Sequence, residues 1–268
     1  MPLAVCATPI GNLEDVTLRV LRELEEAALV LCEDTRHTRR LLERHRISAT
    51  LRSYHEHNEA QRTAEVLPRL KAGERIALVS DAGLPGISDP GVRLVAAALE
   101  AGVPVTVLPG PSAVETALVG SGFGTDRFQF LGYLPRGAGE RHVLWEELAR
   151  WPHAVVAFES PQRLPAALAS LAEALPDRPV AVCRELTKRF EEVVRGPAKD
   201  MAPRFSEGVK GEITLVIGPA EARGAVDDPA AAEAVAELVR SGAARRVAAD
   251  VVSRLTGMPR NKLYRQSL

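Results

Sequence analysis

Aromatic residues are scarce in this sequence, and neither sign of charge is in clear excess. Only 4% of its 268 residues are aromatic whereas 46% are hydrophobic, so the core must be built mainly from Leu, Val and Ala. The formal net charge at pH 7 is −1. A chain with so little net charge has no global field that attracts nucleic acid, so any basic surface must be local.

Cysteines and long apolar runs are also few. Cys6, Cys32 and Cys183 lie in apolar runs, and their odd number and spacing fit neither a disulfide framework nor a metal site. We therefore expect buried thiols in a reducing compartment and no bound metal. The sequence shows no signal peptide and no run long enough to span a membrane, which predicts a cytoplasmic protein.

The stretch from Val79 to Gly91 is the most informative one. It follows an apolar run that predicts a strand at 75–79 and precedes a periodic segment that predicts a helix at 92–101. Its glycines let a ligand approach the main chain, and free amides there attract a carboxylate or phosphate. Asp81 could accept hydrogen bonds from an amine or hydroxyl, while Asp89 is expected to cap the helix. The alternative is a purely structural turn.

Strand and helix patterns alternate through the first half of the chain. We expect strands at 3–7, 29–32, 50–53, 75–79 and 103–108, separated by helices. This alternation predicts an α/β fold with a parallel, doubly wound sheet. Ligands of such sheets bind beyond the carboxyl ends of the strands, where the loops at 8–12, 80–91 and 109–113 should meet.

The pattern changes after residues 120–124. A strand at 128–131 and a flexible connection at 132–137 are followed by helices and by adjacent strands at 179–183 and 190–195, which favours a mixed sheet. We therefore expect an N-terminal α/β domain at 1–122, a C-terminal α/β domain at 123–222 and a helical tail at 223–268. A cleft between two α/β domains is a common ligand site.

The tail is locally basic. From Arg240 onward it carries seven Lys or Arg residues and one acid. Short helices are predicted up to Arg240, at 243–255 and at 259–266, with a turn at Gly257. This arrangement resembles a helix-turn-helix-like module that binds nucleic acid. A dimerising tail with a solvated basic face is the alternative.

Ten stretches together resemble the tetrapyrrole methylase superfamily, most closely its bacterial branch that methylates ribosomal RNA. They occur in order over nearly the whole chain: Ala7–Asp15, Glu33–Arg36, Ser53–Glu59, Ser80–Gly83, Ile87–Gly91, Pro109–Ala113, Phe130–Arg136, Phe158–Pro161, Arg184–Lys188 and Lys210–Glu212. The resemblance implies a bilobal tetrapyrrole-methylase-like fold, a homodimer, and S-adenosylmethionine in the cleft. It also implies 2′-O-methylation of a cytidine in 16S rRNA of the small ribosomal subunit, near the decoding centre.

Motif matching within this resemblance assigns cofactor contacts to both lobes. The residues implied are Ile10, Asp81, Leu84, Ser112 and Ala113 from the first lobe, and Phe158, Cys183 and Thr214 from the second. An amine and a carboxylate on the cofactor would suit a carboxylate and a glycine-rich backbone, and adenine would suit an apolar slot.

A ribose 2′-hydroxyl is a poor nucleophile until it loses its proton, so a general base or a stabilising cation is expected. The catalytic residue itself stays unknown; the candidates are Glu33, Asp34, His55, His57, Glu185 and Lys188. Residues 33–35 could instead cap the next helix. His55 and His57 alternate, so only one of them would face a site if that segment is extended.

The candidate RNA-binding residues are all basic: Arg36, Arg136, Arg245, Arg246, Arg260 and Lys262. Solvated helix faces are the commoner explanation for such residues. Two other functions stay open, namely methylation of a tetrapyrrole or of a modified protein residue, and a non-catalytic RNA-binding factor for ribosome assembly. Retention of Asp81, Ser112 and Ala113 argues against the non-catalytic alternative.

Overall fold

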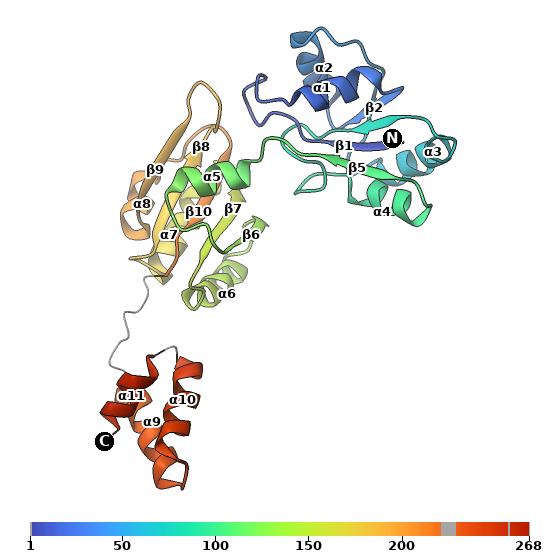
Figure 1. Ribbon diagram of the computed structural model, residues 1–268. Helices are drawn as coiled ribbons and strands as arrows, with labels where there is room; N and C mark the ends of the chain where they lie inside the picture. The colour runs from blue at the N-terminus through green and yellow to red at the C-terminus, as the bar shows by residue number, and fades with distance from the viewer. Residues whose placement is uncertain (1, 221–228, 257, 268) are drawn as a thin grey trace. The chain divides into compact units, whose positions relative to one another are not determined.

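The computed structural model describes residues 2–220, 229–256 and 258–267. The chain divides into two compact units, the first ending at Pro219 and the second beginning at Ala220 (Figure 1). The expected boundary at 222/223 lies outside the described residues, and the three-domain division remains a proposal.

The first lobe of the larger unit is built on a parallel five-stranded sheet. Its strands are β1 (Leu3–Cys6), β2 (Leu29–Cys32), β3 (Leu51–Ser53), β4 (Ile76–Leu78) and β5 (Val105–Leu108), in the order β3-β2-β4-β1-β5. In the plane of the sheet, the connection from β1 runs toward the β3 edge to reach β2. The connection from β4 runs toward the other edge to reach β5. Neighbouring strands with diverging connections form the switch point at which such sheets bind ligands.

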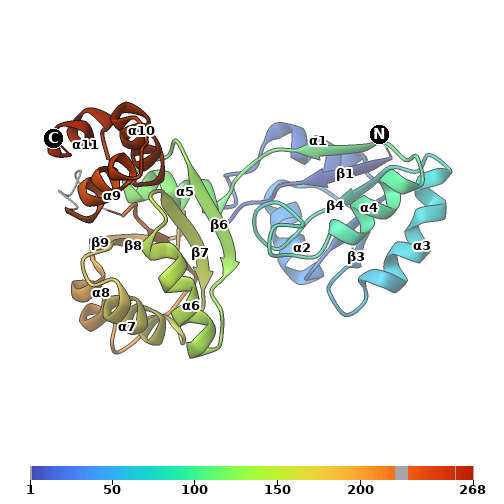
Figure 2. The same cartoon turned by 90° about the horizontal axis from the view of Figure 1, so that it is seen from below.

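Helices cover both faces of this sheet (Figure 2). The helices are α1 (Leu18–Glu26), α2 (Thr35–Arg44), α3 (Glu59–Lys71) and α4 (Val92–Glu100). Leucines and valines of α1 and α2 pack on one face, and those of α3 and α4 pack on the other. The parallel, doubly wound sheet predicted from the sequence is confirmed.

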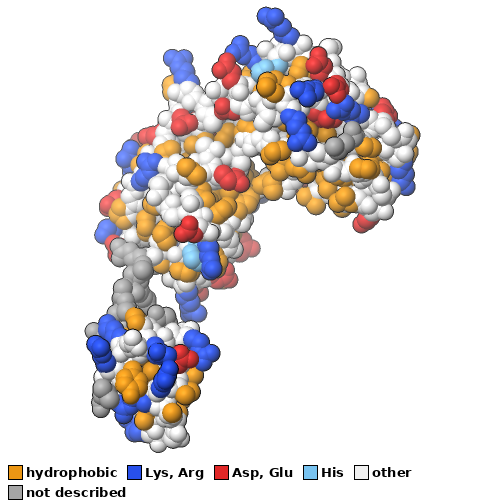
Figure 3. Space-filling view, in the orientation of Figure 1, with side chains coloured by type: hydrophobic (Ala, Val, Ile, Leu, Met, Phe, Trp, Pro, Cys, Tyr) orange, Lys and Arg blue, Asp and Glu red, His pale blue; other side chains and the backbone are white. Residues whose placement is uncertain are grey.

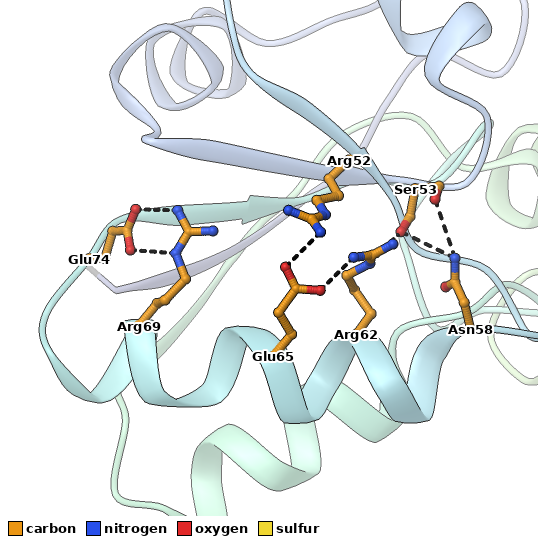
Figure 4. A network of polar contacts seen from close by, with 7 residues as sticks. All are labelled: Arg52, Ser53, Asn58, Arg62, Glu65, Arg69 and Glu74. Atoms are coloured by element: carbon orange, nitrogen blue, oxygen red, sulfur yellow. Dashed lines mark hydrogen bonds and ion pairs between the residues drawn. The ribbon is translucent and has the colours of Figure 1, made fainter.

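Polar contacts fix α3 to the end of β3 (Figure 4). Glu65 on the helix pairs with Arg52 of β3, with 3.0 Å between Nη2 and Oε1, and also with Arg62 on its own helix. Arg62 Nε donates to the Ser53 carbonyl over 3.0 Å, and the Asn58 amide donates to the same oxygen. The turn that carries His55 is thereby held at the carboxyl edge of the sheet.

The second lobe contains a mixed sheet. Its strands are β6 (Phe128–Tyr133), β7 (Ala154–Glu159), β8 (Pro179–Arg184), β9 (Glu192–Pro197) and β10 (Ile213–Ile217), in the order β6-β7-β10-β8-β9. Only the β6–β7 pair is parallel. The helices α6 (Ala138–Ala149), α7 (Leu164–Ala174) and α8 (Ala198–Arg204) cover one face. The other face is covered by α5 (Ala113–Ser121), whose N-terminus follows the loop after β5, so α5 connects the two lobes.

Two local predictions are wrong. The helix α4 begins at Val92 after Gly91, so Asp89 is not its cap, because Gly86, Ser88 and Gly91 all adopt positive φ and add turns to the loop. The strand β6 does not end at residue 131. It continues to Tyr133 through a bulge, with Gly132 at φ 67°, as glycine in a left-handed bulge position allows.

The second unit is a three-helix module. It comprises α9 (Pro229–Arg240), α10 (Arg245–Thr256) and α11 (Arg260–Gln266), packed around a core of its own that includes Val235, Ala249 and Leu263. The expected turn residue Gly257 lies outside the described residues. Within the described ranges, no helix combines the length and the apolar character needed to cross a membrane.

Candidate functional site

The loops after β1 and β4 are joined by their backbones. Thr8 N donates to the Gly83 carbonyl over 2.8 Å, and Gly83 N donates to the Thr8 carbonyl over 3.0 Å. The Thr8 hydroxyl also donates to the Ser80 carbonyl at 3.0 Å. Gly83 adopts a φ of 76°, which a residue with a side chain rarely takes. These bonds place Ile10 and Asp81 at the carboxyl edge of the sheet.

The β8–β9 loop of the second lobe rests against the loop after β1. Asn12 N donates to Thr187 Oγ1 over 3.0 Å. A Cβ at Gly11 would lie 2.5 Å from Lys188 Cγ and 2.8 Å from Thr187 Oγ1, so only glycine allows this approach. The two lobes are thus in direct contact beside the switch point.

A cavity of about 430 Å³ lies where these loops meet, which is within the usual range for small-molecule sites. Residues from both lobes line it. All eight residues expected to contact a cofactor are among them: Ile10, Asp81, Leu84, Ser112, Ala113, Phe158, Cys183 and Thr214. The structure therefore brings together residues that lie far apart in the sequence, from Ile10 to Thr214.

Three carboxylates face this cavity from the first lobe: Glu33, Asp81 and Asp89. Asp34 N donates to Asp81 Oδ1 over 3.1 Å, which fixes the Asp81 side chain. Burial raises the pKa of Glu33, and the charge of Asp81 raises it further. Burial, followed by the charge of Glu33, raises the pKa of Asp89 to about 6. The residue pattern indicated Asp89 only as a helix cap, although the stretch 87–91 belongs to the family resemblance.

Aromatic side chains line the cavity from the second lobe. The Tyr133 and Phe158 rings meet edge to face with centroids 5.6 Å apart, and Phe130 packs on Phe158 at 5.0 Å. Tyr133 is 61% exposed, so its ring is accessible to a large substrate. Burial of the hydroxyl and the charge of Asp89 raise the pKa of Tyr133, because the two side chains are near each other.

The other catalytic candidates lie in different surroundings. Asp34 caps α2 by accepting from Arg36 N at 2.8 Å, as the capping alternative predicted, and pairs with the Arg36 guanidinium at 2.7 Å. His55 lies in a turn, where its Nε2 is 3.0 Å from the Asn58 amide nitrogen. His57 is exposed in the same turn, with its ring 5.9 Å from that of His55.

Glu185 and Lys188 pair with each other rather than lining the cavity. Lys188 Nζ lies 3.0 Å from Glu185 Oε1 and 3.0 Å from Glu212 Oε2, and the Glu212 amide donates to Glu185 over 2.9 Å. This amide holds the pKa of Glu185 low. Because all these bonds link the β8–β9 loop to the start of β10, we interpret the pair as a support for the loop.

The candidate RNA-binding residues are distributed over both units. Arg36 and Arg136 are exposed in the larger unit. In the tail module, Arg246 and Arg260 are exposed, whereas Arg245 is half-buried and donates to the Ser267 carbonyl, and Lys262 is half-buried. Among the described residues, no group of three or more His, Cys, Asp or Glu side chains has the geometry of a metal site.

Comparisons with known proteins agree with this architecture. The profile of the tetrapyrrole (corrin/porphyrin) methylases matches residues 2–202. Ribosomal RNA small subunit methyltransferase I of Micromonospora olivasterospora is 45% identical over 98% of this chain and 85% of its own length. The protein of the same name from Thermotoga maritima is 44% identical over 82% of this chain and 99% of its own length.

A solved structure shows the same fold. Uroporphyrin-III C-methyltransferase of Thermus thermophilus, in complex with S-adenosylhomocysteine, has a TM-score of 0.56 at 20% identity. The match covers 81% of this chain and 96% of that one. At 20% identity this likeness concerns the fold alone. The profile match and the curated relatives show similarity in sequence as well. The chain belongs to the tetrapyrrole methylase family.

Proposed function

We propose that this protein is an S-adenosylmethionine-dependent methyltransferase that modifies the 2′-hydroxyl of a cytidine in 16S rRNA, near the decoding centre of the small ribosomal subunit. The observation that carries the proposal is the interlobe cavity, in which eight residues from six separate segments meet. The name shared by relatives with 45% and 44% identity supports rRNA as the substrate. An rRNA substrate also fits the cytoplasmic location expected from the sequence.

The residues of the cavity fit the cofactor's chemical groups. Asp81, fixed by the Asp34 amide, would bind the amino group. Backbone amides at Ser112 and Ala113, where α5 begins, would bind the carboxylate. Ile10, Leu84 and Phe158 offer an apolar surface for adenine. When bound, the cofactor supplies the methyl group from its sulfonium.

The protein itself must align the nucleophile with the methyl group and exclude water from the site. The bridge between Thr8 and Gly83 and the contact of Gly11 with the β8–β9 loop fix the cavity walls before any ligand binds. Such preorganisation lowers the entropic cost of aligning a nucleophile with the methyl group. The exposed Tyr133 ring offers a stacking surface for a nucleotide base, which suits an RNA substrate.

The tail module would supply additional RNA affinity rather than chemistry. Its segment from Arg240 onward carries seven Lys or Arg residues and one acid, and the module forms a compact unit with a separate core. The profile of the tetrapyrrole methylases matches residues 2–202, all within the larger unit, which supports assigning the cofactor site to that unit.

A homodimer fits the apolar surface of the first lobe. Val92, Leu99 and Val107 are each more than half exposed, and β5 is an edge strand. Figure 3 shows hydrophobic side chains gathered on the lower surface of the first lobe, in the region of α4 and β5. Apolar patches of this kind mark interfaces. Light scattering should show a dimer for the wild-type protein. The Val107→Asp variant should form a weaker dimer.

Transfer of radiolabel from S-adenosylmethionine to isolated small ribosomal subunits tests the proposed function. Label is expected in RNA. Label that stays in the cofactor pool, with binding of the cofactor intact, would instead favour a tetrapyrrole or protein substrate.

A further inference from the structure

The β6–α6 turn (Figure 1) is held by two arginine side chains through its carbonyl oxygens. Arg141 Nη1 on α6 donates to the Arg136 carbonyl over 2.8 Å and to the Pro135 carbonyl over 3.2 Å. Arg163 Nη1, at the N-terminus of α7, donates to the Leu134 carbonyl over 3.3 Å. Guanidinium groups therefore satisfy three consecutive carbonyl groups, which fixes the backbone conformation of this turn.

Arg163 is itself anchored beside the cavity. It pairs with Glu159, a cavity-lining residue whose side chain is fully buried, and its Nε donates to Ser160 Oγ over 3.3 Å. The Ser160 amide donates to Glu159 Oε1 over 2.7 Å. Leu134 N donates to the carbonyl of Phe158, which also lines the cavity, over 3.1 Å. The turn therefore begins at a fixed place in the cavity wall.

Arg141 is a buried cation for which the structure records no ion pair with any described residue. Only 8% of its surface is exposed, and its Nε is buried without a hydrogen-bond partner in the described part of the chain. Its recorded side-chain hydrogen bonds go to the two carbonyl groups of the turn. Burying a guanidinium without a carboxylate costs free energy. Because an apolar side chain would avoid this cost, we interpret Arg141 through the backbone that it holds.

The turn carries an exposed cation, Arg136, close to the exposed ring of Tyr133. Among the described residues, no hydrogen bond or ion pair is recorded for the Arg136 guanidinium, whereas that of Arg36 pairs with Asp34. The chain from Tyr133 to Arg136 spans at most about 10–11 Å, so the two side chains can contact neighbouring groups of one ligand. A ring beside an unpaired guanidinium suits a base and a phosphate of one RNA strand.

The charges around the turn favour an anion. Glu159 neutralises Arg163, and the acid Glu140 lies in the first turn of α6, where the helix dipole stabilises it. Arg136 and Arg141 have no recorded acidic partner within the described ranges. A phosphate that approaches Arg136 therefore meets a second positive charge behind the turn.

We propose that the β6–α6 turn contacts the phosphate backbone of the substrate RNA, with Arg136 binding a phosphate and Arg141 positioning it. This inference rests on the proposed function. Arg141 acts through the turn, because its guanidinium is buried and bonded to the Arg136 carbonyl. It is therefore a positioning residue, and its loss should weaken RNA binding without changing cofactor affinity.

The test is binding of the full chain to unmethylated small ribosomal subunits over a range of salt concentrations. Arg136→Gln should lower the slope of log K against log salt by about 0.7–0.9, which is the contribution of one phosphate contact. Affinity near 0.15 M salt should then fall by about fourfold to fivefold. Arg141→Met keeps a long apolar side chain without a donor and should give a similar loss. The double variant should lose no more than either single variant, because both substitutions remove the same contact.

Arg150→Gln is the matched control, because it removes an exposed positive charge at the other end of α6. Its salt slope should equal that of the wild type. Arg141→Lys keeps the charge but lacks the planar fork that spans two carbonyl groups, so its slope and affinity should lie between those of the wild type and Arg141→Met. Thermal unfolding shows whether each variant folds, and Arg141→Lys replaces Arg141→Met if the latter does not.

Methyl transfer and calorimetry separate this inference from the proposed function. Arg141→Met should raise the KM for subunits and leave kcat unchanged, as expected for a contact made equally in the ground state and the transition state. Each variant should bind S-adenosylmethionine like the wild type. Folded Arg141 variants with the wild-type salt slope, or additive losses in the double variant, would overturn the positioning role and leave the proposed function standing. A wild-type protein that transfers no label to subunit RNA would overturn both.

Discussion

The backbones of Thr8 and Gly83 exchange two hydrogen bonds, 2.8 and 3.0 Å long, across the loops that follow β1 and β4. These strands are neighbours in the sheet, but the chain leaves them in opposite directions. The bridge turns two loops into one wall of the cavity and sets Ile10 beside Asp81. The site is therefore positioned by backbone geometry in the first lobe and completed by side chains of the second.

Replacement of Asp81 by Ala should weaken S-adenosylmethionine binding by about 10-fold to 100-fold, because a charge-assisted hydrogen bond to the amino group is lost. The fold should persist, since Asp81 lies in a loop and is not part of a core cluster. Calorimetry gives the affinity and thermal unfolding gives the stability. Asp177→Ala serves as the control on an exposed loop. Unchanged affinity in a folded Asp81→Ala protein would remove Asp81 from the site.

Gly11→Ala should push the two lobes apart. The added methyl group would meet Lys188, Thr187 and the Leu186 carbonyl within 2.9 Å, so the β8–β9 loop must move. Overpacking of this kind costs about 1–3 kcal/mol in the free energy of unfolding, and cofactor affinity should fall as well. Gly139→Ala in α6 is the matched control, because its Cβ would meet open space and alanine favours a helix. Equal behaviour of the two variants would show that the lobes do not depend on this contact.

Asp89→Asn should stabilise the protein at neutral pH. The pKa of Asp89 is about 6 in the folded state against about 3.9 in an unfolded chain, so the folded state holds the proton more tightly. The carboxyl therefore costs stability that grows as the pH rises from about 4 through 6. After allowance for partial exposure, the difference at pH 8 should be about 1–2 kcal/mol.

Thermal unfolding of the wild type and of Asp89→Asn between pH 4 and pH 8 measures this difference. The two melting temperatures should approach each other toward pH 4, as the carboxyl becomes protonated in both states. A variant that is less stable than the wild type at pH 8 would mean that Asp89 has a stabilising, structural role instead.

A chain that ends at Pro219 should bind S-adenosylmethionine like the full protein and bind RNA more weakly. The cavity lies entirely within the larger unit, whereas the tail from Arg240 onward carries seven Lys or Arg residues and one acid. Loss of phosphate contacts releases fewer counterions, so the salt dependence of RNA binding should become shallower. Filter binding at several salt concentrations gives the slope. Equal affinity and slope for both proteins would assign the tail to dimerisation or to a structural role.

Much of the fold could be predicted from the periodicity of apolar residues and from the turn residues between them. The strand β2 has the predicted bounds, because short apolar runs between turn residues define buried strands well. The family resemblance is confirmed by the profile match over residues 2–202 and by the curated relatives. The departures arose where backbone conformation outweighs local preference, as at the bulge of Gly132 and the left-handed residues before α4.

The site could be anticipated only in part. Loop residues such as Asp81 and Ser112 could be placed on one sheet edge from topology, whereas the pairing of Glu185 with Lys188 depends on a strained turn, with Glu185 at φ 52° and Thr187 at φ 64°. Tyr133 reaches the cavity through the bulge at Gly132, which the residue pattern does not reveal. Electrostatic coupling between Glu33 and Asp89 requires their positions in space.

The most direct test of the proposed reaction is alkaline digestion of small-subunit RNA that the protein has methylated with labelled S-adenosylmethionine. A 2′-O-methyl group removes the nucleophile that cleaves the adjacent phosphodiester. The label should therefore appear in an alkali-resistant dinucleotide, and its 5′ nucleoside should be cytidine. Label found only in mononucleotides would show methylation of a base and would contradict the account.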